Sequence, residues 1–156
     1  MAMPVQKPGK SKQDYCTPPE FLRAVEKRLG IKQFYIDLAA NKETRIVLRY
    51  LWDAFSVSWT EMLPSGEWGW LNPPYSDITP WVEKAYQEAR KDAQIAMLIP
   101  ASVGSNWWAD FVHRRCYVLF PSPRLQFVGT TAPYPKDCAL LLYGCGTIGY
   151  DTWRWK

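Results

Sequence analysis

Residues 67–75 have the sequence EWGWLNPPY, and this stretch decides how the chain folds. Its first part, 67–71, is rich in aromatic and apolar residues, which is typical of a buried strand. Pro73 and Pro74 end that strand, because proline has no backbone N–H to donate to a sheet. The sequence therefore places Asn72 at the carboxyl end of a strand, where α/β sheets bind their ligands.

Further strands and helices are predicted on both sides of this stretch. Apolar runs predict strands over 33–37, 46–51, 95–99, 117–120 and 138–143. Apolar residues at helical spacing predict helices over 17–29, 79–92 and 105–113. Strands that alternate with helices indicate an α/β fold, with a mainly parallel sheet and helices on both of its faces.

The first helix carries the start and stop signals of its class. Thr17 is expected to cap it, and Glu20 completes a capping box of the form T-x-x-E. Gly30 is expected to end it in a left-handed conformation. Thr79 and Ser105 are expected to cap the other two helices in the same way.

Composition limits the classes of protein to consider. The chain has 156 residues, 47% of them hydrophobic and 22% charged, with a net charge of +4. We expect one domain over 14–156, preceded by a basic arm over 1–13. Since no apolar run is long enough to cross a bilayer, we expect no membrane association and a cytoplasmic location. Four cysteines without a C-x-x-C pair and a single histidine, His113, predict no metal site.

The residue types at 72–75 suit chemistry on a nucleobase amino group. The lone pair of such a nitrogen is delocalised into the ring, and two acceptors aimed at its N–H bonds would localise it. The Asn72 side-chain oxygen and the Pro73 carbonyl are candidate acceptors, and Pro74 stiffens the turn. Tyr75 is a candidate to stack on a base that has left its duplex. These four residues alone are equally compatible with an ordinary strand-ending turn.

Four segments taken together resemble a known family. TPPE at 17–20, DLAA at 37–40, NPPY at 72–75 and RLQF at 124–127 resemble, in this order, the phage-associated Dam-type DNA N6-adenine methyltransferases. The resemblance extends from Asp14 to about Tyr143. It implies a minimal Rossmann-like methyltransferase fold and methyl transfer from S-adenosylmethionine to N6 of adenine.

The resemblance also implies roles for particular residues. Thr17 and Pro18 would border the methionine end of S-adenosylmethionine, and Asp37 would bind its amino group. Ala39 would allow the close approach that a glycine gives in larger methyltransferases. Asn72 would contact both cofactor and substrate, and Asp53 is a weaker candidate for either.

One position departs from the family pattern. The family often has an acidic residue before the tryptophan that matches Trp59, and this chain has Ser58 there. Either Asp53 or Glu61 takes over that role, or the adenine and cofactor contacts are weaker.

The expected partner is DNA that contains the target adenine, in the cytoplasm of a bacterial host if a phage encodes the chain. Candidate DNA contacts are Tyr75, Arg124, Phe127, Ser105 and Trp107. The protein is expected to be a monomer or a weak dimer. Two alternatives remain: methylation of cytosine N4 or of a protein glutamine, and a non-catalytic DNA-binding module. Asn72, in place of serine, favours adenine over cytosine.

Overall fold

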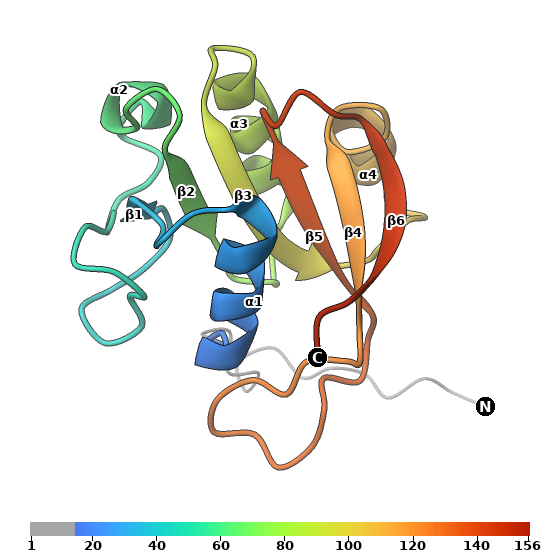
Figure 1. The fold of residues 1–156 in the computed structure, drawn as a ribbon. Coiled ribbons are helices and arrows are strands. Elements are labelled where there is room, and N and C mark those ends of the chain that lie inside the picture. The colour runs from blue at the N-terminus through green and yellow to red at the C-terminus, as the bar shows by residue number, and fades with distance from the viewer. Residues whose placement is uncertain (1–14) are drawn as a thin grey trace.

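A mixed sheet forms the centre of the computed structural model, which describes residues 15–156 (Figure 1). The predicted arm over 1–13 lies outside the described residues. In these residues the sheet has six strands in the order β1-β2-β3-β5-β4-β6. Their bounds are β1 Ile36–Asp37, β2 Trp68–Leu71, β3 Gln94–Pro100, β4 Tyr117–Ser122, β5 Cys138–Tyr143 and β6 Gly149–Arg154.

Strand direction confirms the α/β class and corrects the expectation of a mainly parallel sheet in one respect. Pairs β1–β2, β2–β3 and β4–β6 are parallel, but β5 is antiparallel to both of its neighbours, β3 and β4. The connection from β4 to β5 contains no helix, and neighbouring strands joined without a crossover helix run antiparallel. The sheet is therefore mixed.

Helices cover both faces of the sheet, as predicted. Figure 1 shows α1 (Pro19–Leu29) on one face, with α3 (Thr79–Ala89) and α4 (Asn106–Phe111) on the other. Alternate residues of β3 point to the two sides: Ile95, Met97 and Ile99 pack with α3 and α4, and Ala96 and Leu98 pack with α1. A strand covered on both faces explains why 95–99 is apolar without interruption.

Two strand predictions near the amino terminus were too long. The predicted strand over 33–37 shrinks to β1, and 46–51 forms only an isolated bridge between Tyr50 and Asp37. The Ile46 N–H donates to the Asp37 carboxylate, 3.1 Å away, and so leaves the sheet ladder. Strand β6 and the short helix α2 (Trp59–Met62) were not predicted.

Of the three expected helix caps, only Ser105 occupies an N-cap position, and none of the three side chains makes a capping hydrogen bond. Helix α1 begins at Pro19 with Pro18 at the N-cap position, and no side chain caps it. The same holds for α3 and α4, where Thr79 and Ser105 make no capping hydrogen bond. Prolines in the first turn explain this for α1, because they already remove orphan N–H groups. The predicted stop at Gly30 is confirmed, with φ of 70°.

Candidate active site

A cavity of about 210 Å³ opens at the carboxyl ends of β1 and β2. Its walls come from segments that are far apart in the sequence but meet at this edge of the sheet. The lining residues are Tyr15, Cys16, Thr17, Asp37, Ala39, Ala40, Asn41, Thr44, Ile46, Trp52, Trp70, Asn72, Pro74 and Trp81. Four of the six predicted cofactor residues, namely Thr17, Asp37, Ala39 and Asn72, are therefore brought together.

Asn72 follows β2 directly and makes three side-chain hydrogen bonds. Its Nδ2 donates to the Tyr15 carbonyl at 2.7 Å and to the Thr17 hydroxyl at 3.0 Å. Its Oδ1 accepts from the Tyr75 hydroxyl at 2.9 Å. A backbone carbonyl can only accept, so the contact with Tyr15 identifies the amide nitrogen and leaves the oxygen on the Tyr75 side.

Asp37 is a buried carboxylate at the pocket wall, with 3% of its surface exposed. Burial raises its pKa to about 6, although backbone N–H groups of Ala39 and Ile46 act in the opposite direction. At pH 7 the group is mainly ionised and surrounded by little water. Such a carboxylate is suited to bind a cationic group of a ligand.

Tyr75 belongs to a cluster of four aromatic rings, which we call the aromatic cluster: Tyr15, Tyr75, Phe127 and Tyr134. Neighbouring ring centroids in it lie between 4.9 and 6.3 Å apart. Burial raises the pKa of Tyr75 well above its usual value, so its phenol stays protonated. Phe127 is only 1% exposed, and contact with DNA would require it to leave the cluster.

None of the five candidate DNA contacts lines the pocket. Arg124 is exposed and its Nε pairs with Asp137 at 2.9 Å. Ser105 is the N-cap residue of α4, and the half-buried Trp107 packs beside Trp108 with ring centroids 5.8 Å apart. Pro18 and Asp53 also lie outside the lining, and Asp53 is exposed.

Several pocket residues were not predicted from the sequence. Trp52 is 80% exposed and lines the pocket, whereas its neighbour Asp53, the candidate cofactor residue, does not. Trp81, on α3, contacts Phe55 with ring centroids 4.6 Å apart. It lines the pocket as well. Tyr15 contributes a backbone carbonyl, which no sequence pattern reveals.

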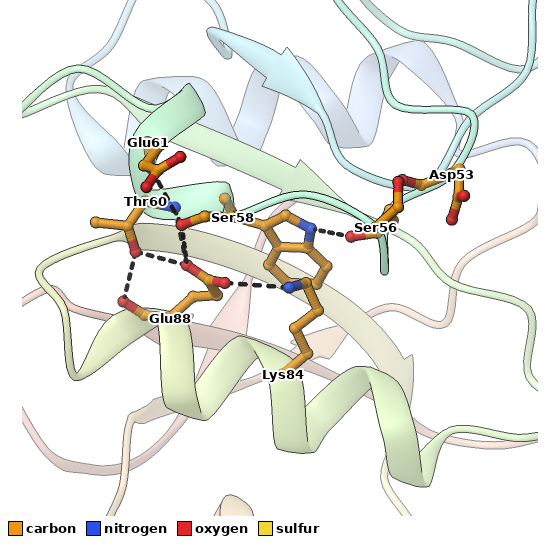
Figure 2. A network of polar contacts seen from close by, with 9 residues as sticks. Asp53, Ser56, Ser58, Thr60, Glu61, Lys84 and Glu88 are labelled. Atoms are coloured by element: carbon orange, nitrogen blue, oxygen red, sulfur yellow. Dashed lines mark hydrogen bonds and ion pairs between the residues drawn. The ribbon is translucent and has the colours of Figure 1, made fainter.

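The departure at Ser58 has a structural explanation in a second polar network (Figure 2). Ser58 is the N-cap residue of α2 and accepts from the Glu61 N–H at 3.4 Å. Its hydroxyl also lies 3.4 Å from Glu88, whose carboxylate accepts from Thr60 and Lys84. None of Ser58, Asp53 and Glu61 lines the pocket.

Glu88 is the centre of this network and is 3% exposed. Burial alone would raise its pKa, but hydrogen bonds from the Thr60 hydroxyl at 2.6 Å, the Thr60 N–H at 2.9 Å and Lys84 at 3.1 Å lower it to about 2. Its carboxylate thereby ties α3 to α2.

Within residues 15–156, no cluster of three or more His, Cys, Asp or Glu side chains could hold a metal ion. No helix in the same range is long and apolar enough to cross a membrane.

The fold and the pocket define an α/β domain with a pocket beside an Asn-Pro-Pro-Tyr turn. The chain belongs to the DNA N-6-adenine-methyltransferase (Dam) family, whose model matches residues 5–139. It is similar to a DNA N-6-adenine-methyltransferase of Escherichia phage T1, with 32% identity over 101 residues. That match covers 62% of this chain and 39% of the phage protein. The predicted family is thereby confirmed.

Proposed function

We propose that this protein transfers a methyl group from S-adenosylmethionine to N6 of adenine in DNA, through one Rossmann-like methyltransferase domain over 14–156. The observation that carries the proposal is the Asn72 amide. Its nitrogen donates to Tyr15 and Thr17, its oxygen accepts from Tyr75, and Asn72 lines a pocket that Asp37 also lines. The neutral Asn72 amide oxygen suits an amino group that accepts the methyl group. The Asp37 carboxylate suits a cationic methyl donor such as a sulfonium compound.

The residues of the pocket fit this cofactor. Asp37 offers a carboxylate to the ammonium group of the methionine part, and Thr17 offers a hydroxyl. Trp52 and Trp81 offer aromatic faces for a purine, and Ala39 leaves room for close approach. When bound, S-adenosylmethionine supplies an electrophilic methyl group on its sulfur.

The protein's own part of the chemistry is to prepare and place the amino group. Asn72 Oδ1 and the Pro73 carbonyl accept its two N–H bonds, which localises the nitrogen lone pair. Positioning of this kind contributes on the order of 7–11 kcal/mol in well-oriented systems. Pro73 is buried and Pro74 holds the turn rigid, so the two acceptors keep a fixed relation.

On the DNA side, we propose that Tyr75 stacks on the extruded adenine. Arg124, Ser105, Trp107 and Phe127 would contact the surrounding strand, Phe127 after a rearrangement of the aromatic cluster. Extrusion of a base costs a few kcal/mol, which stacking in the pocket partly offsets.

The test is to locate the transferred methyl group. The protein is incubated with unmethylated duplex DNA and S-adenosylmethionine labelled on its methyl group, and the DNA is digested to nucleosides. We expect the label in N6-methyladenine. Label in N4-methylcytosine or in protein glutamine would overturn the adenine assignment, and no transfer to any acceptor would favour a non-catalytic DNA-binding module.

A further inference from the structure

We infer that the segment Tyr15–Thr17 positions Asn72 for catalysis and makes this site selective for asparagine over aspartate. The Tyr15 carbonyl and the Thr17 hydroxyl hold the amide nitrogen, so that the oxygen stays on the side of the reacting amino group. This inference rests on the proposed function. It assigns Tyr15 and Thr17 to positioning, in addition to the cofactor contact proposed for Thr17.

The hydrogen-bond partners of the Asn72 amide determine which of its ends is nitrogen and which is oxygen. Oxygen and nitrogen of an asparagine side chain have nearly the same size, so hydrogen-bond partners decide which way the amide faces. The Tyr15 carbonyl lies 2.7 Å from Nδ2 and accepts only. A reversed amide would place two acceptor oxygens against each other. The Thr17 hydroxyl, 3.0 Å from Nδ2, takes the second N–H.

The segment Tyr15–Thr17 is itself held in place by contacts with other parts of the protein. Thr17 is 7% exposed and takes no part in capping α1. The Cys16 carbonyl accepts from the Val128 N–H at 3.1 Å, and the Tyr15 ring packs on Phe127 with centroids 4.9 Å apart. The segment that carries the Tyr15 carbonyl is therefore held in place by the loop before β5.

The Asn72 side-chain oxygen has one lone pair that no residue of the described range, 15–156, uses in a hydrogen bond. Asn72 Oδ1 accepts from the Tyr75 hydroxyl, which uses one of its two lone pairs. The other lone pair is left for an N–H of the substrate. The Tyr75 hydroxyl also lies 3.3 Å from the Leu98 carbonyl, so its proton has a second acceptor.

Aspartate at position 72 would be equally able to accept an N–H bond, yet it has no donor for the Tyr15 carbonyl. Its ionised form would face that carbonyl with a negative oxygen. Its protonated form would donate to the carbonyl and keep the second oxygen as an acceptor. The introduced carboxyl should therefore have a raised pKa, and only the protonated form should support transfer.

The closing experiment compares wild type and Asn72→Asp from pH 5 to 8 by single-turnover methyl transfer. At pH 7.5 we expect transfer by Asn72→Asp to be reduced about 100-fold. The ratio of variant to wild type should rise about tenfold or more as pH falls. A variant as active as wild type at pH 7.5, or a ratio independent of pH, would overturn the inference.

Using the ratio at each pH removes titrations that both proteins share. The titratable groups around position 72 are Asp37, Tyr15 and Cys16, which line the same pocket, and Tyr75, which bonds to Asn72; Cys138 on β5 lies near Tyr75. Burial raises the pKa of Asp37 to about 6, and burial raises that of Cys138 to about 12. Both are present in wild type and variant.

Thermal unfolding of the free protein gives a readout that needs no activity. A group whose pKa is raised on folding stabilises the protein below its unfolded pKa, and this contribution is lost as pH rises. Asn72→Asp should therefore unfold at a lower temperature than wild type at pH 7.5, and the gap should narrow toward pH 5. A gap that does not change with pH would count against the inference.

Thr17 supplies an independent variant pair. Thr17→Val should lower kcat about tenfold through the loss of the hydrogen bond that orients Asn72, in addition to any rise in KM for S-adenosylmethionine from the loss of its proposed cofactor contact. Thr17→Ser should restore kcat, and Thr152→Val on the exposed face of β6 is the matched control. A rise in KM alone would identify Thr17 as a cofactor contact without a positioning role. If wild type transfers no methyl group to adenine, the proposed function fails, and unfolding still tests the orientation of residue 72.

Discussion

Asn72 and Glu88 are each the centre of a polar network. Asn72 is a neutral amide bound by Tyr15, Thr17 and Tyr75 at the wall of a pocket. Glu88 is a buried carboxylate bound by Thr60, Lys84 and Ser58, between two helices (Figure 2).

The difference lies in what each network leaves available. Glu88 has its charge compensated by Lys84 and by hydroxyl and N–H donors within the protein, which is how a buried charge becomes tolerable. Asn72 lines the pocket with both N–H bonds committed, and its oxygen accepts one hydrogen bond and so keeps a second lone pair. Glu88 is therefore expected to serve stability, and Asn72 is expected to serve chemistry.

The largest effect should come from Asn72→Ala. Removal of a preorganised hydrogen-bonding group at a reacting atom typically lowers kcat by roughly 10²–10³-fold. The affinity for DNA should change little, since DNA affinity comes mainly from phosphate contacts. Single-turnover transfer and a DNA-binding titration measure the two quantities. Asn106→Ala, an exposed asparagine at the start of α4, is the control and should behave as wild type.

Glu88→Gln should have the opposite profile. The glutamine amide would face the Thr60 and Lys84 donors with an N–H group, and we expect a loss of about 1–3 kcal/mol in the free energy of unfolding. Transfer activity of the folded variant should stay within a few-fold of wild type. Urea denaturation followed by tryptophan fluorescence measures the loss. A folded Glu88→Gln protein without transfer activity would contradict the claim that Glu88 serves stability alone.

The same substitution should show its effect in a defined pH range. The pKa of Glu88 is lowered from 4.5 to about 2 on folding, because its hydrogen bonds outweigh burial. Such a group stabilises the folded state above its unfolded pKa, and this contribution is lost as pH falls toward the folded pKa. The stability difference between wild type and Glu88→Gln should therefore shrink from pH 4.5 downward.

The contribution of Asp37 to stability should depend on pH in the opposite direction to that of Glu88. Burial raises its pKa from 3.8 to about 6, so the charged form is disfavoured in the free protein. Its contribution to stability is full below about pH 3.8 and is lost as pH rises through 6, by on the order of 3 kcal/mol. Asp37→Asn should remove this dependence in urea denaturation curves recorded between pH 4 and 7.5. Parallel curves for both proteins would contradict the assignment.

Ser58→Ala should have the smallest effect. It removes the side-chain cap of α2, which is typically worth about 1 kcal/mol, and one long contact to Glu88. Because Ser58 does not line the pocket, activity should be unchanged. A loss of transfer in a stable Ser58→Ala protein would show that this position acts at the site, as the family's acidic residue was expected to do.

The sequence predicted those elements whose residues are decided by burial. The strands that became β2, β3 and β5 are apolar because the sheet is covered on both faces, and position 72 followed at a strand end. Strand β6 was missed because its side chains are mostly exposed and polar, so no apolar run marks it. The span 46–51 was overpredicted because the Asp37 carboxylate, a long-range partner, binds its first N–H.

The site was predictable as far as it depends on side-chain types at strand ends. Thr17 lines the pocket, and its hydroxyl, which was expected to cap α1, does not do so. Its partner is Asn72, 55 residues away, and no local pattern indicates such a bond. The orienting role of Tyr15 belongs to a backbone carbonyl, which every residue has, so only the folded geometry distinguishes it.

Calorimetric titration of the wild-type protein with S-adenosylmethionine tests the central claim most directly, namely that the pocket at the ends of β1 and β2 holds the methyl donor beside Asn72. We predict saturable binding at pH 7.5 with one site, weakened at least tenfold by Asp37→Asn and retained by Glu88→Gln. Absence of binding to wild type, or equal affinity in Asp37→Asn, would contradict the claim.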